Sequence, residues 1–387
     1  YWDFQNSLNI EHDMSFAEAV DGTRDRLIQS MSLRTRSDVP LAFCMSGGID
    51  SNSLISIAKR ELGYDVHGFT LMSKDQRYEE DELVEKSVRE LGIQHTKIPL
   101  DTRNFLQNLQ ELVAKHGQPI STISYYIHWN LVKEVSSNGY KISISGTAAD
   151  ELFTGYYDHN NLYFYEFKDS SKDLNIAISY WKKGIGSFVR NPFLQDPYLY
   201  INNPEFRDHI FLNNDLFSDY LKDSWQENFN EKGFHSSLLR NRMLNELFEE
   251  AIPIILQEDD LNAMSVSIEN RSPFLDSDLF SHAYSIPTHH LISKGKTKSV
   301  LREAMRGIVP DFILDNDRKV GFNASLEELM DFSSQETKEF FDQESSIYEI
   351  VKKEKIMELI SKKDLPNSFS KFLFNFINAK IFLDQQN

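Results

Sequence analysis

Short apolar runs alternate with helical segments between Phe16 and Ile144, and this alternation constrains the fold more than any other feature of the sequence. The run at 41–45 stands between Pro40 and a Ser-Gly-Gly turn, which is typical of a strand buried on both faces. We predict strands at residues 41–45, 66–72, 94–98 and 142–144, and helices at 16–33, 54–62, 79–91 and 102–115. This order predicts an α/β fold with a parallel twisted sheet flanked by helices, and ligands at the carboxyl edge of its strands.

The alternation is lost from about Asp158, and the rest of the chain is predicted to be mostly helical. Gly and Pro residues separate amphipathic segments there, among them 297–305 and 369–382. We therefore predict three parts, which are a linker with a lead-in helix over 1–38, an α/β core over 39–157 and a mostly helical portion over 158–387.

Composition excludes several classes of protein. The chain has 41 Lys and Arg against 59 Asp and Glu, a net charge of −18, which argues against nucleic-acid partners because phosphate backbones require clustered cations. A single cysteine, Cys44, excludes an internal disulfide and a Cys-based zinc site, and its apolar surroundings predict a buried structural thiol. No apolar segment approaches the ~18 residues that would span a bilayer. We expect a soluble cytoplasmic protein without membrane partners.

The block Ser46-Gly47-Gly48-Ile49-Asp50-Ser51 follows the first predicted strand and opens a helix. In this position the backbone N–H groups of a Gly-rich turn and of a helix N-terminus can hold an anion. The turn lacks the Lys of a Walker loop, and Asp50 would repel a phosphate unless a cation lay between them, which indicates Mg²⁺. Alone, the pattern also fits a tight strand-to-helix turn that binds nothing.

A second block, SGTAADELFTGY at 145–156, also follows a predicted strand. Because parallel strands end at the same edge of a sheet, Asp50 and Asp150 are expected to lie close together, where two carboxylates can hold Mg²⁺. The alternative for Asp150 and Glu151 is a solvated helix start, at which acidic side chains are favoured by the helix dipole.

Two further blocks follow: DLNAMSVSIENRSPFLD at 260–276, and KSVLR at 298–302 with RKVGF at 318–322. In this order the four blocks resemble the synthetase domain of the glutamine-dependent asparagine synthetase family, which belongs to the PP-loop group of ATP pyrophosphatases. The resemblance runs from Val39 to Phe322, more than two-thirds of the chain. Tyr1-Trp2-Asp3 resembles the junction that follows the N-terminal glutaminase domain in that family.

The resemblance implies an enzyme that uses ATP and Mg²⁺ to adenylate a substrate carboxylate, releases pyrophosphate and lets ammonia displace AMP. It implies catalytic roles for Lys319, Asp50 and Asp150, with Lys319 neutralising the leaving pyrophosphate and both Asp residues holding Mg²⁺. The residues implied in ATP or pyrophosphate binding are Ser46, Gly47, Gly48, Asp50, Ser51, Phe69, Thr70, Leu71, Ser145, Gly146, Lys298 and Lys319. Those implied in acceptor binding are Thr147, Glu151, Asp260, Glu269 and Arg271.

Some of these assignments have equally good alternatives. Lys298 and Arg302 stand four residues apart on one predicted helix and also fit a structural ion-pair role. Glu269 and Arg271 fit a buried structural pair as well as an acceptor site.

The acceptor is left open by one departure from the family pattern. Members that make asparagine have an acidic residue where this chain has Thr147, and a hydroxyl cannot replace a carboxylate as proton acceptor near neutral pH. The acceptor is thus aspartate, a sugar carboxylate or another small carboxylate. A second hypothesis for the enzyme is that the amine belongs to the substrate itself, as in β-lactam or peptide cyclisation. A third hypothesis is a protein that binds nucleotide without catalysing a reaction. The implied partners are ammonia, a glutaminase domain on the same full-length chain and, in a homodimer, a second copy of the chain.

Overall fold

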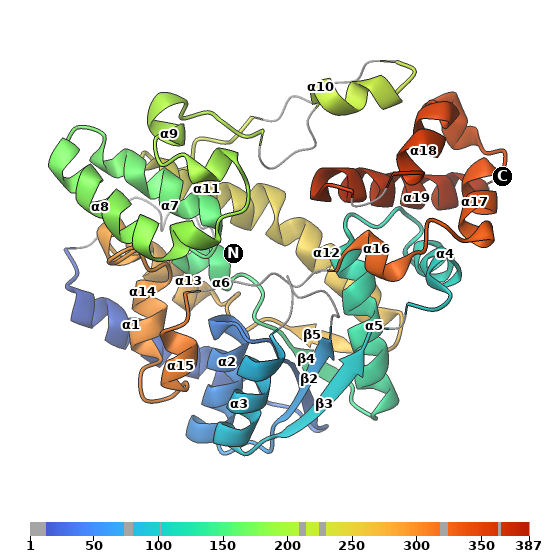
Figure 1. The fold of residues 1–387 in the computed structure, drawn as a ribbon. Helices are drawn as coiled ribbons and strands as arrows, with labels where there is room; N and C mark the ends of the chain where they lie inside the picture. Colours follow the sequence, from blue (N-terminus) through green and yellow to red (C-terminus); the bar gives the residue numbers. More distant parts are fainter. Residues whose placement is uncertain are drawn as a thin grey trace.

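A computed structural model describes residues 13–72, 80–100, 102–208, 214–223, 230–317, 324–362 and 365–386. Its centre is one sheet of five strands in the order β3-β2-β1-β4-β5, and every neighbouring pair is parallel (Figure 1). The strands are β1 (Leu41–Cys44), β2 (His67–Met72), β3 (Gln94–Pro99), β4 (Ile142–Ile144) and β5 (Glu269–Arg271). The predicted α/β fold with a parallel sheet flanked by helices is confirmed.

The fifth strand is a difference from the prediction, because no strand is expected after residue 144. β5 extends the sheet beside β4, with Ser143 opposite Asn270, and the Ser143 hydroxyl donates a hydrogen bond to the Asn270 side chain. The strand consists of only Glu, Asn and Arg, so it has no apolar run that could reveal it. Its pairing therefore depends on a neighbour that is distant in sequence.

Both faces of the sheet are covered, as the apolar run at 41–45 predicts. Leu41 and Phe43 pack into a large core with α2 (Ile49–Ser56) and α3 (Asp81–Leu91) on one face. Ala42 and Phe69 pack under α5 (Ile123–Ser137) and α12 (Ile252–Met264) on the other.

Helix α5 is not among the predicted helices. Five consecutive buried residues, Tyr125 to Trp129, hide the helical period of its sequence.

The other helices form two groups (Figure 1). One group shares the large core or packs beside it: α1 (Phe16–Arg34), α6 (Ala149–Phe153), α7 (Tyr157–Phe164), α8 (Ser171–Lys183), α9 (Leu199–Asn202), α11 (Leu238–Asn245), α13 (Ser277–Ser285), α14 (Ser299–Ala304) and α15 (Asp311–Leu314). The second group has its own core: α4 (Phe105–His116), α10 (Asn214–Phe217), α16 (Leu326–Leu329), α17 (Gln335–Asp342), α18 (Lys353–Ile360) and α19 (Asn367–Gln386).

Local signals account for the ends of several helices. Ser15 and Glu18 form a capping box at the start of α1, in which the Ser15 side chain accepts from Glu18 N and the Glu18 carboxylate accepts from Ser15 N. Helix α3 ends at Gly92, whose φ of 59° lies in the left-handed region that glycine adopts without strain. Both boundaries are predictable from sequence.

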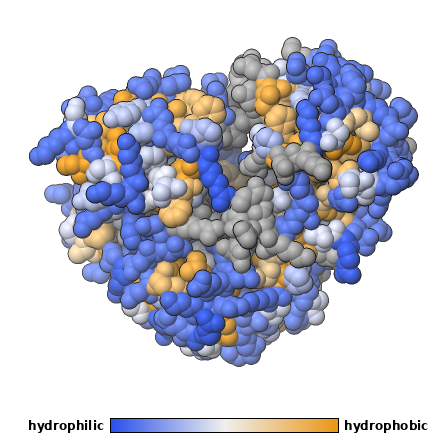
Figure 2. All heavy atoms as spheres, in the orientation of Figure 1, coloured by the Kyte–Doolittle hydropathy of each residue, from blue (hydrophilic) through white to orange (hydrophobic). Residues whose placement is uncertain are grey.

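Within the described ranges, no helix combines the length and the apolar character needed to cross a membrane. Figure 2 shows one face of the molecule as mostly hydrophilic, with hydrophobic side chains scattered over it.

Candidate active site

Two acidic loops meet at the carboxyl edge of the sheet. Asp50 lies in the first turn of α2, directly after β1, and Asp150 lies in the first turn of α6, directly after β4. The strands are neighbours, so the loops emerge side by side. Gly146 allows their close approach, since a Cβ on this residue would lie only 2.9 Å from the Cβ of Asp50.

The loop after β1 is held by its own polar side chains. Ser46 N donates to Ser51 Oγ at 3.2 Å, and Gly48 N donates to Ser46 Oγ at 3.2 Å. Asn52 is fully buried and donates from Nδ2 to the carbonyl oxygens of Ser46 and Gly48, at 2.9 and 2.7 Å. Asn52 is absent from the sequence-based site, and its only signal is a polar residue on a buried helix just after the turn.

A carboxylate lies against the same loop. Gly47 N donates to Glu80 Oε2 at 3.0 Å, and a Cβ on Gly47 would lie 3.1 Å from Glu80 Oε1. Glu80 immediately precedes α3 and is also absent from the sequence-based site. At least one N–H of this turn therefore donates to an anionic oxygen in this structure.

Lys298 joins the two acidic loops. Its Nζ lies 2.5 Å from Asp50 Oδ1 and 2.5 Å from Asp150 Oδ1. The Lys298 side chain is only 5% exposed, whereas Asp50 and Asp150 keep 25% and 18% exposure. Burial works against the charge of Lys298, but Asp150 and Asp50 more than offset it and raise the pKa of this lysine. Two carboxylates that converge on one cation are an oxygen donor set that suits Mg²⁺, so these residues fit a magnesium site.

Three of the six non-glycine residues with positive φ in the described part of the chain lie around the same point. Ala148, Thr154 and Lys298 have φ values of 77°, 68° and 57°, in the left-handed region that non-glycine residues rarely adopt. The hydroxyl of Thr154 accepts a hydrogen bond from Lys298 N at 3.2 Å, which links the strained positions of two loops. Strain of this kind persists only where surrounding contacts enforce it, and it is common at functional sites.

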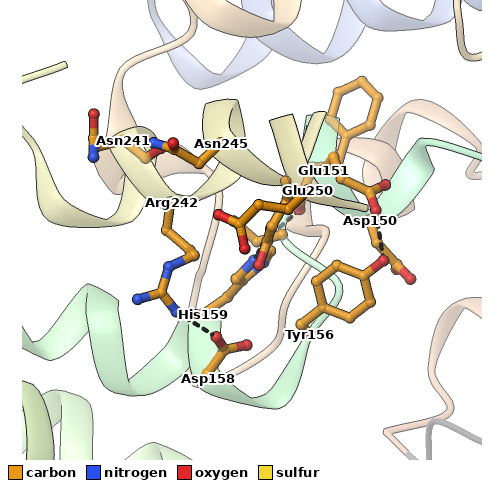
Figure 3. Close-up of polar contacts among 12 residues, drawn as sticks. Asp150, Glu151, Tyr156, Asp158, His159, Asn241, Arg242, Asn245 and Glu250 are labelled. Atoms are coloured by element: carbon orange, nitrogen blue, oxygen red, sulfur yellow. Dashed lines mark hydrogen bonds and ion pairs between the residues drawn. The ribbon is translucent and has the colours of Figure 1, made fainter. Parts of the chain in front are cut away.

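Glu151, which is buried, and Tyr156, which is partly exposed, form a pair beside Asp150 (Figure 3). The Tyr156 hydroxyl donates to Glu151 Oε1 at 2.5 Å, and Tyr284 donates to the Glu151 carbonyl at 3.1 Å. Burial and the nearby charge of Asp150 raise the pKa of Glu151 to about 7, against the opposing effect of the Tyr156 hydrogen bond. The solvated helix start considered for Glu151 is wrong, because this side chain is enclosed.

Behind this pair lies a network of buried charges. Arg242 on α11 donates to Asp158 Oδ2 at 3.1 Å and pairs with Glu231, and His159 Nε2 lies 2.9 Å from Glu246 Oε2 (Figure 3). Ligand atoms of Asp158, His159 and Glu246 lie within 4.8 Å of one another, but each of these side chains already has a partner. The network joins residues up to 87 positions apart, so no sequence spacing could reveal it.

Replacement of Arg242 by Met should destabilise the protein by about 3 to 5 kcal/mol, because it removes the cation that pairs with the buried Asp158 carboxylate, while Glu231 keeps its second partner, Arg207. Urea unfolding followed by circular dichroism measures the loss. Lys232→Met is the matched control: its partner Glu249 lies 2.7 Å away, but the lysine is 62% exposed, so under about 1 kcal/mol should be lost. Equal losses in the two variants would contradict the structural role of the network.

The predicted nucleotide residues of β2 differ in how they face the site. Phe69 is fully buried under α5, so only its backbone could meet a ligand. Thr70 Oγ1 donates to Met45 O at 2.8 Å and lies 3.0 Å from His95 Nε2. Leu71 is partly exposed at the end of the strand.

In the second block, hydroxyl groups form a chain along the β4 loop. Ser145 Oγ lies 3.0 Å from Thr147 Oγ1 and 3.3 Å from Ser272 Oγ. Thr147 thus lies on the loop that carries Asp150, and its hydroxyl is already engaged with Ser145.

The remaining predicted acceptor residues lie along β5 and α12. Arg271 pairs with Glu269 at 2.7 Å and donates from Nη1 to the carbonyl oxygens of Arg34 and Arg36, at 2.7 and 2.9 Å. These contacts bind the end of α1 to the sheet edge, beside an open cavity of about 470 Å³. Asp260 is exposed on α12.

A largely enclosed acid–imidazole pair next to Asp260 is absent from the predicted site. Asp259 Oδ1 lies 3.2 Å from His128 Nδ1, between α12 and α5. Burial raises the pKa of Asp259, with His128 acting against the rise. Asp259 and Asp260 are adjacent in sequence, and only packing against α5 distinguishes the enclosed carboxylate from the exposed one.

Lys319, the predicted catalytic lysine, lies outside the described residues, as does the rest of the RKVGF block. Arg302 lies inside and makes structural contacts: its guanidinium donates to the carbonyl oxygens of Thr297, Leu314 and Asn316, at 2.9, 2.5 and 3.1 Å. Arg302 therefore holds the chain segment that leads to Lys319.

Cys44 allows a chemical test of the layer between the sheet and α5. Burial, with a smaller effect of the Asp259 carboxylate, raises the pKa of its thiol to about 12, although the residue as a whole keeps partial exposure. Because the thiolate is the reactive form, we expect alkylation at pH 8 to be roughly a thousandfold slower than for a free thiol. Iodoacetamide labelling followed by mass spectrometry measures the rate, and labelling in urea should restore it. A native rate within tenfold of glutathione would contradict the burial of the thiol.

Comparisons with known proteins identify the family of the chain. A family model described as asparagine synthase matches residues 22–381. Asparagine synthetase [glutamine-hydrolyzing] 1 of Bacillus subtilis (strain 168) is 26% identical over 355 residues, which cover 88% of this chain and 55% of that protein. Asparagine synthetase [glutamine-hydrolyzing] 3 of the same organism is 22% identical over 339 residues, covering 81% of this chain and 50% of that protein.

A relative with another name matches over a similar range. Amidase chyE of Penicillium rubens is 23% identical over 368 residues, covering 82% of this chain and 54% of that protein. The chain therefore spans about half the length of each of these three relatives. Since the family model covers most of the chain, the protein belongs to the asparagine synthase family.

Proposed function

We propose that this chain is the ATP-dependent, amide-forming part of an enzyme that activates a carboxylate as an acyl-adenylate and transfers an amine to it. The main support for the proposal is that Asp50 and Asp150 both form ion pairs with Lys298, beside the Gly-rich loop at the carboxyl edge of a parallel sheet. Ligands of open α/β sheets bind at this edge. Family membership supports ATP use and C–N bond formation.

The proposed reaction has two steps. An oxygen of the substrate carboxylate attacks the α-phosphorus of ATP, and the bond from that phosphorus to the bridging oxygen of the β-phosphate breaks, releasing pyrophosphate. The amine nitrogen then attacks the acyl carbon, the bond to the AMP oxygen breaks, and a proton is lost as the amide forms. Such transfers depend mainly on positioning and on neutralising phosphate charge.

Named side chains supply these functions in the proposal. Asp50 and Asp150 hold Mg²⁺, which supplies charge neutralisation at the phosphates when it is bound. The loop from Ser46 to Ser51 binds the pyrophosphate, with Gly47 N as a hydrogen-bond donor and with Lys298 and Lys319 as cations. Thr147 and Glu151 belong to the acceptor side of the site.

The amine donor and the acceptor are separate parts of the proposal. The two bacillary relatives are named glutamine-hydrolyzing, and this chain covers about half of each, so we infer that ammonia comes from a glutaminase portion of a longer protein. The acceptor is a small carboxylate, either aspartate, which the asparagine synthetases among the relatives support, or a sugar acid, which the Thr147 departure leaves open.

The test is an acceptor screen with ATP, Mg²⁺ and ¹⁵N-labelled ammonium, so that no glutaminase is needed. Aspartate and a panel of uronic acids are tried one at a time, and AMP, pyrophosphate and the product mass are measured. We expect one carboxylate to raise AMP and pyrophosphate together and to gain one ¹⁵N atom.

Other outcomes distinguish the alternatives. A product formed with AMP but without ¹⁵N would favour an internal amine, as in cyclisation, because Thr147 offers no carboxylate for the ammonia step. No rise with any carboxylate, together with no increase in melting temperature on adding ATP and Mg²⁺, would favour a protein that does not bind nucleotide and would overturn the proposal.

A further inference from the structure

The charges around the proposed nucleotide site are supplied by the chain itself. A cation, the ammonium of Lys298, lies between the two carboxylates that would hold the metal, 2.5 Å from an oxygen of each. An anion, the carboxylate of Glu80, lies 3.0 Å from Gly47 N in the loop that would hold pyrophosphate. Each occupies the place expected for one half of a magnesium–pyrophosphate ligand.

The two carboxylates at the metal position cannot neutralise the Lys298 ammonium and Mg²⁺ at the same time. Lys298 is 5% exposed, so its charge is compensated mainly by Asp50 and Asp150 and hardly by water. A Mg²⁺ ion bound to the same two oxygens would place three positive charges against two negative ones. The ammonium must then leave or gain another anion, and the phosphates of the ligand are such anions.

The anion position presents the same competition. Gly47 N has one hydrogen to donate, and it is directed at Glu80 Oε2. The Glu80 carboxylate fills the space next to Gly47, since a Cβ there would lie within 3.2 Å of Glu80 atoms. A phosphate oxygen can accept a hydrogen bond from Gly47 N only if the Glu80 carboxylate moves away. Repulsion between the negative phosphate and the negative carboxylate would favour that movement.

We propose that Lys298 and Glu80 are exchangeable internal ligands, which hold the metal position and the anion position when the site is empty and leave both when magnesium–pyrophosphate or magnesium–ATP binds. The inference rests on the proposed function. It goes further by giving Lys298 two successive partners, first the carboxylate pair and then the phosphates, and by assigning a role to Glu80. As a consequence, metal alone and phosphate alone bind weakly, and the pair binds with positive coupling.

The metal side is tested by binding of Mn²⁺, followed by electron paramagnetic resonance without nucleotide. Lys298→Met removes the competing ammonium, and we expect it to bind Mn²⁺ at least about tenfold more tightly than the wild type, a change that a single lost charge–charge contact can account for. Lys296→Met is the matched control, because Lys296 lies on the same segment, is 39% exposed and contacts Asp317. This control should bind Mn²⁺ as the wild type does.

The folded state of Lys298→Met needs its own measurement, since the variant brings two carboxylates together without a cation. Its melting temperature should rise with Mn²⁺ by several degrees more than that of the wild type, because the metal takes the place of the ammonium. A variant that is folded only with the metal present supports the proposal in the same way.

The anion side is tested independently with Glu80→Gln and inorganic pyrophosphate in the absence of metal. Glutamine is nearly the same size but uncharged, so pyrophosphate should bind several-fold more tightly, as measured by calorimetry. Glu82→Gln, an exposed acid in the first turn of α3, is the matched control and should leave the affinity unchanged.

Two results would overturn the proposal. One is equal or weaker Mn²⁺ affinity in folded Lys298→Met than in the wild type, and the other is unchanged pyrophosphate affinity in Glu80→Gln. If Lys298→Met does not fold under any condition, the Glu80 result decides. Absence of manganese–pyrophosphate binding by the wild-type protein would instead overturn the proposed function, and with it this inference.

Discussion

Replacing Asp150 by Asn is expected to lower the rate of AMP and pyrophosphate formation roughly a thousandfold. Asparagine keeps the size of the side chain but removes one of the two negative charges that converge on Lys298. If the pair holds the magnesium that neutralises the phosphates, its loss costs about 4 kcal/mol in the transition state, and each 1.4 kcal/mol, approximately, is tenfold in rate. The measurement is the rate of pyrophosphate release with the best acceptor and ammonium.

A matched control separates this effect from a general change of charge. Asp25 is exposed on α1 and far in sequence from both acidic loops, so Asp25→Asn should keep full activity. Asp50 still pairs with Lys298 in the Asp150 variant, so circular dichroism should show a folded protein. Folded Asp150→Asn with activity within tenfold of the wild type would exclude Asp150 as a metal ligand.

Gly155→Ala should both destabilise the protein and abolish most of its activity. A Cβ on Gly155 would lie 1.6 Å from Asp150 Oδ1 and 2.3 Å from its Cγ, far inside van der Waals contact. Either the loop or the Asp150 side chain has to move, which we expect to cost about 2 to 3 kcal/mol of stability. Because small displacements of reacting groups are costly, activity should fall about a hundredfold or more. Urea unfolding and the pyrophosphate assay measure the two effects.

The control for this prediction is Gly233→Ala. A Cβ on Gly233 would meet no heavy atom within 4 Å, so stability should change by less than about 0.5 kcal/mol. The double variant Gly155→Ala, Asp150→Ala loses the two closest atoms, and its stability loss should be smaller than the sum of the single losses. Fully additive losses would show that the steric conflict with Asp150 is not the cause.

Much of the α/β core can be predicted from sequence because its signals are local. The apolar run at 41–45 and the Gly-rich turn after it place Asp50 at the carboxyl edge, and the same logic places Asp150. Helix boundaries such as Ser15 and Gly92 depend on hydrogen bonds and dihedral angles within a few residues. Helix α5 is missed where one buried aromatic follows another and the helical period disappears.

The candidate site is only partly predictable for the same reason. Gly146 and Gly155 are recognisable as glycines of a motif, but only the folded chain shows that both are pressed against carboxylate-bearing residues, Asp50 and Asp150 respectively. Arg271, read as either an acceptor-site residue or a structural one, is found bound to the carbonyl oxygens of Arg34 and Arg36. Nothing near Arg271 in the sequence indicates those partners.

By itself, the sequence determines the class of fold, the family to which the four blocks point and the presence of two acidic residues at one sheet edge, because strand periodicity and turn chemistry act between near neighbours. Tertiary structure decides which charges meet. Lys298 reaches Asp50 across 248 positions of the chain, and Glu80 reaches Gly47 across 33. Such contacts depend on how helices and loops pack against the sheet, and the sequence pattern carries no signal for them. The two chain-supplied charges at the proposed nucleotide site become visible only in the folded molecule.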